Sequence, residues 1–396
     1  MGTTSFQGRD SARAHPFRKV IGSGQFPSTR TPVLTTAMVS AGRGATESEV
    51  CRESARVGLV KPLVISHPAC FLHRNSPGHP ERPARIEAAL IGARSWGGEV
   101  DEREAALASK ADLSLVHDPV YVDAIEEFCR EGGGELDPDT GAVPGTWEAA
   151  RRAAGAGLVA IEAIQAGASP VAFLAIRPPG HHAHAARALG FCIFNNIAIA
   201  AERLVSEGAR VAIVDYDVHH GDGTQETFGA RSDVLYVSLH EYPFYPGSGW
   251  LEEVGHGQGT GRTVNIPLPP GTAGDAIEQA FTRIVIPVVA QFTPDWILVS
   301  AGYDGHRADP LADWVLEADD YGRMARHLSH FGVPVIYFLE GGYEYDAIVA
   351  SVAATLQGAA GADFPTPTGV SPGVAVEMVE TSAAQAGKHW NGVQGG

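Results

Sequence analysis

Short apolar runs alternate with helical patterns along most of the chain. Runs rich in β-branched and other apolar residues predict buried strands at residues 62–66, 171–176, 210–214, 233–239, 264–268, 296–300 and 333–339. Apolar residues at helical spacing, or stretches rich in alanine, predict helices at residues 86–93, 115–130, 146–166, 196–206, 276–291, 319–331 and 345–356. Strands that alternate with helices indicate a parallel sheet with helices on both faces. We therefore predict one α/β domain over residues 61–360.

The two ends of the chain differ in composition from this domain. Residues 1–60 are rich in Ser, Thr, Gly and Arg, and Asp10 is the only acidic residue between Met1 and Ala45. This composition predicts a mostly disordered arm, although an arginine-rich, acid-poor segment is also compatible with a transit peptide. Residues 361–396 are rich in Pro, Gly and Ala, and we expect them to form a loosely attached tail.

The charge and cysteine content narrow the possible partners. The chain of 396 residues has a formal net charge of −17, from 29 Lys and Arg against 46 Asp and Glu. This balance argues against direct nucleic-acid binding, which needs a basic surface. No apolar run approaches the roughly 20 residues of a membrane span. The 4 cysteines show no CxxC pair, so a reducing, cytoplasmic location is expected unless the arm is a transit peptide. The oligomeric state stays open.

The stretch VAIVDYDVHHGDG at residues 211–223 changes character at the end of a predicted strand. Asp215, Asp217 and His219 alternate, so in an extended segment their side chains point the same way. Asp222 follows between two glycines that permit a sharp turn. Two carboxylates and an imidazole beside a buried strand are unfavourable unless they are paired or bind a cation. The stretch therefore predicts a metal site rather than a solvated turn.

Three further predicted strands end in polar clusters. RPPGHHAH contains His181 and His182, AGYDGHRADP contains Asp304, and LEGGY contains Tyr343. In an open α/β sheet, ligands bind outside the carboxyl ends of the strands, so we expect the four clusters to share one edge. Four such clusters on the same edge are hard to explain by packing alone.

The side chains at this edge match the requirements of amide hydrolysis. One nitrogen and two oxygen ligands, which leave a position open for water, are typical of a catalytic zinc site; the candidates are Asp217, His219 and Asp304. His181 and His182 could accept a proton, and Asp215 and Asp222 could orient them. Tyr343 could donate a hydrogen bond to an oxyanion. Together these groups predict metal-assisted hydrolysis of an amide.

Several motifs resemble those of the histone deacetylase family in the broad sense. That family includes bacterial histone-deacetylase-like amidohydrolases and acetylpolyamine amidohydrolases. The motifs are, in order, RPPGHHA, GFCIFNN, VDYDVHHGDGTQ, YPFYPGSG, SAGYDGHRADPL and LEGGY, and SPGHPERPARI resembles the first active-site loop of class II-like members. The resemblance runs from about residue 62 to about residue 356. It implies the arginase/deacetylase fold, a single three-layer α/β/α domain on a mostly parallel sheet of about eight strands.

The resemblance also implies two ion sites. The implied zinc ligands are Asp217, His219 and Asp304, and Tyr343 would polarise the amide carbonyl together with the zinc. The family also binds a monovalent cation, typically potassium, near the zinc. The matching potassium ligands are backbone or side-chain groups of Asp215, Asp217, His219, Ser238 and Leu239.

The resemblance assigns different roles to the two adjacent histidines. His182 would be the main general base and acid, oriented by Asp222. His181 would be its more protonated partner, held by Asp215. Many class II relatives have Asn at the position of Asp222, so this position is more similar to the class I pattern.

The resemblance also predicts the walls of the substrate tunnel. The implied wall residues are Gly190, Phe191, Tyr245 and Leu311. Family members often have Phe at the position of Tyr245, whose hydroxyl could favour a slightly more polar substrate. An acidic residue at the position of Leu311 favours polyamines in some members. Leucine there favours acetyl-lysine in a protein over a small acetylated amine.

Other chemically interesting residues have simpler explanations. Cys192 is expected to be a small buried hydrophobic residue rather than a nucleophile. Loop or packing roles are expected for four histidines, His73, His79, His240 and His306. Two acidic residues in the Gly- and Pro-rich loop at 131–145 could receive the backbone or the amine of a substrate; they are Asp137 and Asp139.

Three alternatives to a protein deacetylase remain at this point. The first is an acetylpolyamine or other small-molecule deacetylase. The second is a binuclear manganese ureohydrolase on the same fold, which would need further carboxylates where this chain has His220, Tyr303 and Gly305. The third is a catalytically silent acyl-lysine binding protein, although inactive relatives usually lose the tyrosine, a ligand or one of the two histidines, and all are present here.

Overall fold

The computed structural model describes residues 60–393. The predicted N-terminal arm therefore lies almost entirely outside the described residues, as do the predictions of disorder and of a transit peptide. Within residues 60–393, no helix is both long enough and apolar enough to cross a membrane.

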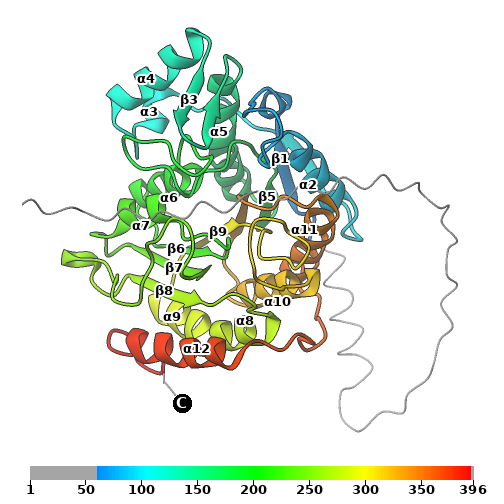
Figure 1. Cartoon of the computed structure of the whole chain (residues 1–396), viewed down its shortest axis with the longest axis vertical. Helices are drawn as coiled ribbons and strands as arrows, with labels where there is room; N and C mark the ends of the chain where they lie inside the picture. The colour runs from blue at the N-terminus through cyan, green and yellow to red at the C-terminus, as the bar shows by residue number, and fades with distance from the viewer. Residues whose placement is uncertain (1–59, 394–396) are drawn as a thin grey trace, which may run out of the picture. The chain divides into compact units, whose positions relative to one another are not determined.

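A sheet of eight parallel strands forms the centre of the fold (Figure 1). The strands follow the order β2-β1-β5-β10-β9-β6-β7-β8, and every pairing between them is parallel. Their bounds are β1 (Leu63–Ser66), β2 (Asp101–Glu104), β5 (Val171–Leu174), β6 (Val211–Asp215), β7 (Val234–Glu241), β8 (Thr263–Leu268), β9 (Trp296–Ala301) and β10 (Val335–Leu339). The predicted parallel α/β fold is confirmed.

Helices cover both faces of this sheet, because both faces of its strands are apolar. Along β6, Val211 and Ile213 pack in one core with α5 (Thr146–Gln165) and α6 (Asn196–Ser206). Ala212 and Val214 point into a second core on the opposite face. That face carries α2 (Ala84–Arg94), α8 (Gly274–Ala280), α9 (Ile286–Phe292), α10 (Ala318–Ser329) and α11 (Tyr345–Ala359). The three-layer arrangement follows from this alternation.

Smaller elements connect these layers. Further helices include α3 (Lys110–Leu113), α4 (Pro119–Arg130) and α7 (Asp222–Phe228), and 3₁₀ turns occur at Pro68–Phe71 and Gly257–Gly259. The segment predicted as one helix over 276–291 contains a π turn at Phe281–Val285. Pro287 lies just after this π turn, in the first turn of α9.

One strand and one hairpin depart from the sequence-based expectation. β2 has the charged sequence DERE and lies at the edge of the sheet, so it shows no apolar run. The loop expected at 131–145 contains an antiparallel hairpin, β3 (Gly134–Asp137) and β4 (Thr140–Ala142). β2 and β3 contain no buried residue and β4 has only 3 residues, which explains why their pattern was weak.

The expectation of a loosely attached tail after residue 360 is wrong for the residues described. The tail forms α12 (Gly373–Ala386), which packs on β8 and α8 (Figure 1). Its buried residues recur at helical spacing, namely Ala375, Val379, Ala383 and Ala386. Beyond the helix, the Trp390 indole N–H donates to the Gly261 carbonyl at 2.8 Å. The small size of the buried alanines disguised an amphipathic helix as a low-complexity tail.

Candidate active site

The carboxyl ends of four neighbouring strands meet at one edge of the sheet. These strands are β5, β10, β9 and β6, in that spatial order. The predicted polar clusters follow each of them directly, so the structure brings together the side chains of His181, His182, Asp217, His219, Asp304 and Tyr343. The parallel topology thus gathers groups that are far apart in the sequence.

Asp217, His219 and Asp304 form a buried cluster suited to a metal ion. One possible ligand atom from each lies within 4.8 Å of the other two. His219 Nδ1 is 3.2 Å from Asp217 Oδ1 and 3.1 Å from Asp304 Oδ2. The second oxygen of Asp217 accepts the Gly341 N–H at 2.7 Å, and that of Asp304 accepts the Val218 N–H at 3.2 Å. Each carboxylate therefore presents one oxygen to His219 while a backbone N–H holds the other, and Asp217 Oδ1 also accepts the His219 N–H at 2.9 Å.

Two glycines make room for this cluster. A Cβ atom at Gly341 would lie 2.0 Å from Asp304 Oδ2 and 2.6 Å from Asp217 Oδ2. A Cβ atom at Gly302 would lie 2.1 Å from Asp217 Oδ2. The backbone thus closes tightly around the two carboxylates. Two carboxylates and one imidazole, held this closely in a buried position, fit the donor set of a catalytic zinc site.

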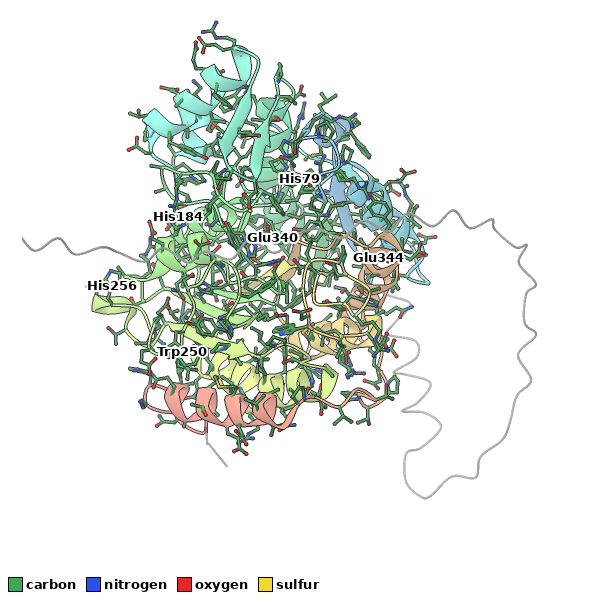
Figure 2. The ribbon with its side chains drawn as sticks, viewed as in Figure 1. His79, His184, Trp250, His256, Glu340 and Glu344 are labelled. Atoms are coloured by element: carbon green, nitrogen blue, oxygen red, sulfur yellow. The ribbon has the colours of Figure 1, made fainter. Side chains whose placement is uncertain are left out.

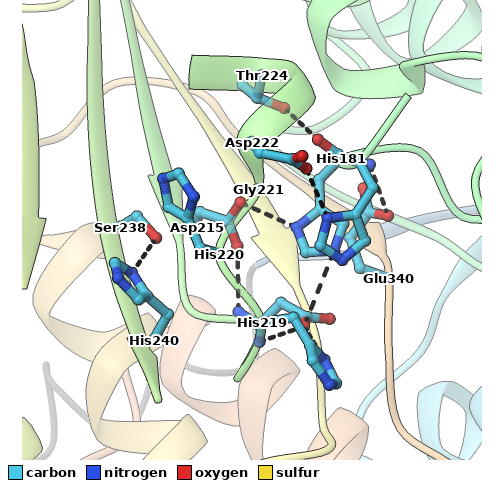
Figure 3. Close-up of polar contacts among 12 residues, drawn as sticks. His181, Asp215, His219, His220, Gly221, Asp222, Thr224, Ser238, His240 and Glu340 are labelled. Atoms are coloured by element: carbon cyan, nitrogen blue, oxygen red, sulfur yellow. Dashed lines mark hydrogen bonds and ion pairs between the residues drawn. The ribbon is translucent and has the colours of Figure 1, made fainter. Parts of the chain in front are cut away.

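The adjacent histidines each contact a different carboxylate (Figure 3). His181 Nδ1 is 3.1 Å from Asp215 Oδ2, and His182 Nδ1 is 2.8 Å from Asp222 Oδ1. Burial opposes a charge on His181, but Asp215 and Asp217 outweigh it and raise its pKa well above the usual value. Burial and the charge of His181 lower the pKa of His182 to about 4. The pair therefore combines a cationic and a neutral imidazole.

Asp222 has a second histidine partner that the sequence did not reveal. His184, which Figure 2 labels, has its Nε2 3.0 Å from Asp222 Oδ2 and its Nδ1 2.7 Å from Glu226 Oε2. Burial alone would raise the pKa of Asp222, but the hydrogen bonds to His182 and His184 lower it. The RPPGHHAH motif contains this residue, two positions beyond the pair.

Tyr343 follows two glycines at the end of β10, and its side chain is buried. Gly342 has a φ of 110°, a conformation that favours glycine. The Arg85 guanidinium lies 4.9 Å from the centre of the Tyr343 ring and donates to the carbonyls of Glu340 and Gly342. Burial raises the pKa of the Tyr343 phenol well above its usual value. The hydroxyl therefore stays protonated and can act as a hydrogen-bond donor.

Arg85 belongs to a buried ionic network. Glu81 contacts Arg85 at 3.1 Å and Arg177 at 2.6 Å, and all three side chains are fully buried. Burial would raise the pKa of Glu81, but Arg177 and His73 lower it well below its usual value. Glu81 and Arg85 belong to the SPGHPERPARI motif, but their roles were not predicted. Their spacing of four residues was the one feature of the sequence that could have indicated this ion pair.

A pocket of about 260 Å³ opens onto the cluster. All four predicted wall residues line it, namely Gly190, Phe191, Tyr245 and Leu311. Its other lining residues include His182, His219, Tyr343, Cys192 and Asp139. The Cys192 side chain is buried, and burial raises its pKa well above the usual value. Such a thiol is a poor nucleophile.

Phe191 is held in an unusual backbone conformation. Its φ is 69°, and its N–H donates to the buried Thr140 hydroxyl at 3.0 Å. Its ring packs edge-on against Tyr343, with the ring centres 6.0 Å apart. The β3–β4 hairpin, which contains Thr140, thus supports one wall of the pocket.

The residues predicted to bind potassium lie beside the cluster. Asp215 is paired with Ser238 in the β6–β7 register, and Leu239 follows on β7. Asp215 Oδ1 accepts the Asp217 N–H at 3.2 Å, and Ser238 Oγ is 2.9 Å from His240 Nδ1. Potassium binding by these residues stays a prediction.

The four histidines with expected loop or packing roles lie outside the pocket lining. His73 is buried against Glu81 and Thr146, and His79 packs edge-on against Phe191. His240 and His306 are likewise not among the lining residues. Of the two loop acids, Asp139 lines the pocket, while Asp137 accepts the Asp139 N–H at 2.8 Å.

The fold and this site together define a three-layer α/β protein with a candidate hydrolytic metal centre at the carboxyl edge of a parallel sheet. Comparison with known proteins identifies the family. The sequence model described as "Histone deacetylase domain" matches residues 79–359, so the chain belongs to the histone deacetylase family.

Individual relatives agree with this assignment. A protein named "Probable deacetylase" from Archaeoglobus fulgidus is 40% identical over 293 residues, which are 72% of this chain and 81% of that protein. "Polyamine deacetylase HDAC10" from Homo sapiens is 37% identical over 339 residues, which are 79% of this chain and 50% of that protein. The crystal structure of the HDA15 HD domain matches with a TM-score of 0.79 and 33% identity, covering 84% of this chain and 96% of that one. The chain is thus similar to deacetylases in both sequence and fold.

Proposed function

We propose that the protein is a zinc-dependent deacetylase that removes an acetyl group from acetyl-lysine in a protein. The observation that carries this proposal is the meeting of the Asp217–His219–Asp304 cluster, the His182–Asp222 pair and Tyr343 around one pocket. A metal site, a proton acceptor and an oxyanion donor are the three requirements for metal-assisted amide hydrolysis.

The cluster residues would hold the zinc ion through the facing carboxylate oxygens and the His219 imidazole. When bound, zinc lowers the pKa of a water molecule and polarises a carbonyl oxygen. A two-manganese centre would need further carboxylates at the positions of His220 and Tyr303. His220 instead lies 2.8 Å from the Ser248 hydroxyl and 3.0 Å from the Gln225 amide oxygen, which favours the single-ion proposal.

His182 would move the proton. Because Asp222 engages its Nδ1, the free Nε2 is the atom that can take a proton from the attacking water. Its lowered pKa keeps this nitrogen unprotonated at neutral pH. After the carbon–nitrogen bond breaks, the same nitrogen returns the proton to the departing amine, and the cationic His181 stabilises the negative charge that develops nearby.

Tyr343 would donate a hydrogen bond to the oxyanion that forms from the acetyl carbonyl. Its buried hydroxyl faces the same pocket as His182 and His219. A donor that is fixed in place before the reaction stabilises the transition state without reorganisation.

The pocket wall supports acetyl-lysine over an acetylated polyamine. Phe191 and Tyr245 would flank the aliphatic part of the lysine side chain, and Leu311 adds another apolar wall. A polyamine carries a second ammonium group, for which Leu311 offers no charge. Because one relative is named a polyamine deacetylase, this alternative is the competing candidate.

A potassium ion held by Asp215 and Ser238 would support the loop that carries Asp217 and His219.

The experiment compares an acetyl-lysine peptide with N-acetylputrescine, in wild-type protein and in Tyr343→Phe. We expect faster turnover of the peptide, and a loss of at least about 100-fold in kcat for Tyr343→Phe, the size of an oxyanion-donor effect. Tyr345→Phe, a nearby half-buried tyrosine that does not line the pocket, is the matched control. Faster cleavage of acetylputrescine would reverse the substrate proposal. Peptide binding without acetate release, unchanged in Tyr343→Phe, would favour a silent binding protein.

A further inference from the structure

A buried carboxylate joins the loop after β9 to the loop after β10. Asp309 is 7% exposed and accepts three backbone N–H groups. Its Oδ1 accepts from Leu311 at 3.0 Å, and its Oδ2 accepts from Tyr343 at 2.6 Å and from Glu344 at 3.3 Å. Figure 2 labels Glu344, the last of these donors. One side chain thus connects the Leu311 wall of the pocket with the segment that carries Tyr343.

The contact with Tyr343 completes a clamp on a single peptide group. The Gly342 carbonyl and the Tyr343 N–H belong to the same planar peptide unit. Arg85 donates to the carbonyl end of this unit, and Asp309 accepts from its N–H end. Both partners are buried, the Arg85 bond is of the stronger, charge-assisted kind, and the Asp309 bond is short at 2.6 Å.

This peptide group needs such a clamp because two glycines precede Tyr343. Glycine has the widest conformational freedom, and Gly342 already has a φ of 110°. With Asp309 and Arg85 in place, the peptide plane cannot rotate without breaking one hydrogen bond. The direction of the Tyr343 Cα–Cβ bond is thereby fixed.

We propose that Asp309 is a positioning residue for the reaction, which holds the Tyr343 hydroxyl at the oxyanion site by fixing the peptide from which this side chain extends. The inference rests on the proposed function of Tyr343. The phenol oxygen is far from the backbone, so a rotation of about 15° at the peptide moves it by more than about 1 Å, and a misplacement of this size can lower a rate about 100-fold.

Asparagine at this position gives a sharp test. It keeps the size of the side chain but replaces one accepting oxygen with an NH₂ donor, so it cannot accept from both loops at once. Asp320→Asn is the matched control, because Asp320 is also a buried carboxylate and accepts the Glu317 N–H at 2.8 Å at the start of α10. It does not line the pocket.

The experiment is a double-mutant cycle on the zinc-loaded protein with an acetyl-lysine peptide. We expect Asp309→Asn to lower kcat by roughly 10- to 100-fold, to change KM by less than about threefold and to leave the zinc content unchanged. In the Tyr343→Phe background the same substitution should cost less than about threefold, since the hydroxyl that it positions is already absent. Asp320→Asn should leave kcat within about twofold in both backgrounds.

The outcomes separate this inference from the proposed function. If Tyr343→Phe turns over like wild type, the role of Tyr343 fails, and the inference fails with it. Suppose instead that Tyr343→Phe is slow. If Asp309→Asn then lowers kcat by the same factor in Tyr343→Phe as in the wild-type protein, the inference about Asp309 is wrong while the role of Tyr343 stands. Loss of zinc in Asp309→Asn would also overturn it, by showing a metal-site defect. Should this variant not fold, Asp309→Ser, whose small hydroxyl can accept one N–H, enters the same cycle with the same criteria.

Discussion

The substitution Gly341→Ala is predicted to abolish metal binding by steric crowding alone. Gly341 is not among the residues with positive φ, so alanine can adopt its backbone conformation. The added Cβ, however, would lie 2.0 Å from Asp304 Oδ2 and 2.6 Å from Asp217 Oδ2. The substitution therefore crowds two proposed zinc ligands without straining the backbone.

The size of the effect follows from these distances. Ordinary contacts of a Cβ atom begin at 3.4 Å, so Asp304 Oδ2 would have to move by more than 1 Å. Both carboxylates are also fixed by backbone N–H groups at Gly341 and Val218, which limits how they can move. Metal sites tolerate ligand displacements of only about 0.2 Å, and even indirect changes cost roughly 10- to 100-fold in affinity. We expect a loss of at least about 100-fold in zinc affinity.

The assay is competition for zinc between the protein and a chromophoric chelator, followed by peptide turnover of the loaded protein. Gly373→Ala is the control, because its Cβ would have nothing within 4 Å. Thermal unfolding of the two metal-free variants shows whether the fold is retained. Zinc affinity of Gly341→Ala within about threefold of wild type, in folded protein, would refute the assignment of Asp217 and Asp304 as ligands.

Three further predictions concern the surrounding structure. Burial lowers the pKa of His117 from 6.5 to about 4. As the pH falls, this histidine is therefore protonated in the unfolded chain before it is protonated in the folded protein, and the stability present above pH 6.5 is lost towards pH 4. Urea unfolding should show a fall of about 2 kcal/mol between pH 7 and 5 from this residue, which His117→Gln removes; an equal fall in that variant would contradict the reasoning. On α12, Val379→Asp should destabilise the protein by about 3 kcal/mol or more, whereas exposed Val374→Asp should change stability by at most about 0.5 kcal/mol, and similar melting temperatures would argue against a packed tail. Thr140→Val removes the acceptor for the Phe191 N–H and should raise KM for the peptide roughly 3- to 10-fold with a smaller change in kcat; an unchanged KM would show that the hairpin does not support this wall.

The parallel fold could be predicted from the sequence because its buried strands are continuous apolar runs. The same reasoning located the candidate site, since the carboxyl ends of parallel strands meet at one edge and only the strand ends need to be known. It failed for β2, whose charged residues lie at a sheet edge, and for α12, whose buried face consists largely of alanine. In both cases the packing partner, rather than the local pattern, determines the element.

The supporting residues of the site could not be predicted in the same way. Asp309 contacts N–H groups 34 and 35 residues away, and Arg85 donates to carbonyls 255 and 257 residues away. A single Asp or Arg in a loop shows no periodicity that would indicate such partners. The candidate metal cluster was visible because its residues directly follow two predicted strands, whereas the clamp on Tyr343 joins loops whose contacts leave no pattern in the sequence.

The strand order also has a consequence for how the protein is made. β5 and β6 follow each other in the chain, but β10 and β9 lie between them in the sheet. A nascent chain that has emerged only as far as α9 can expose Asp217 and His219, yet it lacks Asp304 and both central strands. The third proposed ligand, Asp304, arrives only with β9, and the gap in the sheet closes when β10 follows. We therefore expect the proposed metal ion to bind only after the whole domain has been synthesised. A bound ion that a chelator cannot remove would then indicate that the two central strands have been inserted.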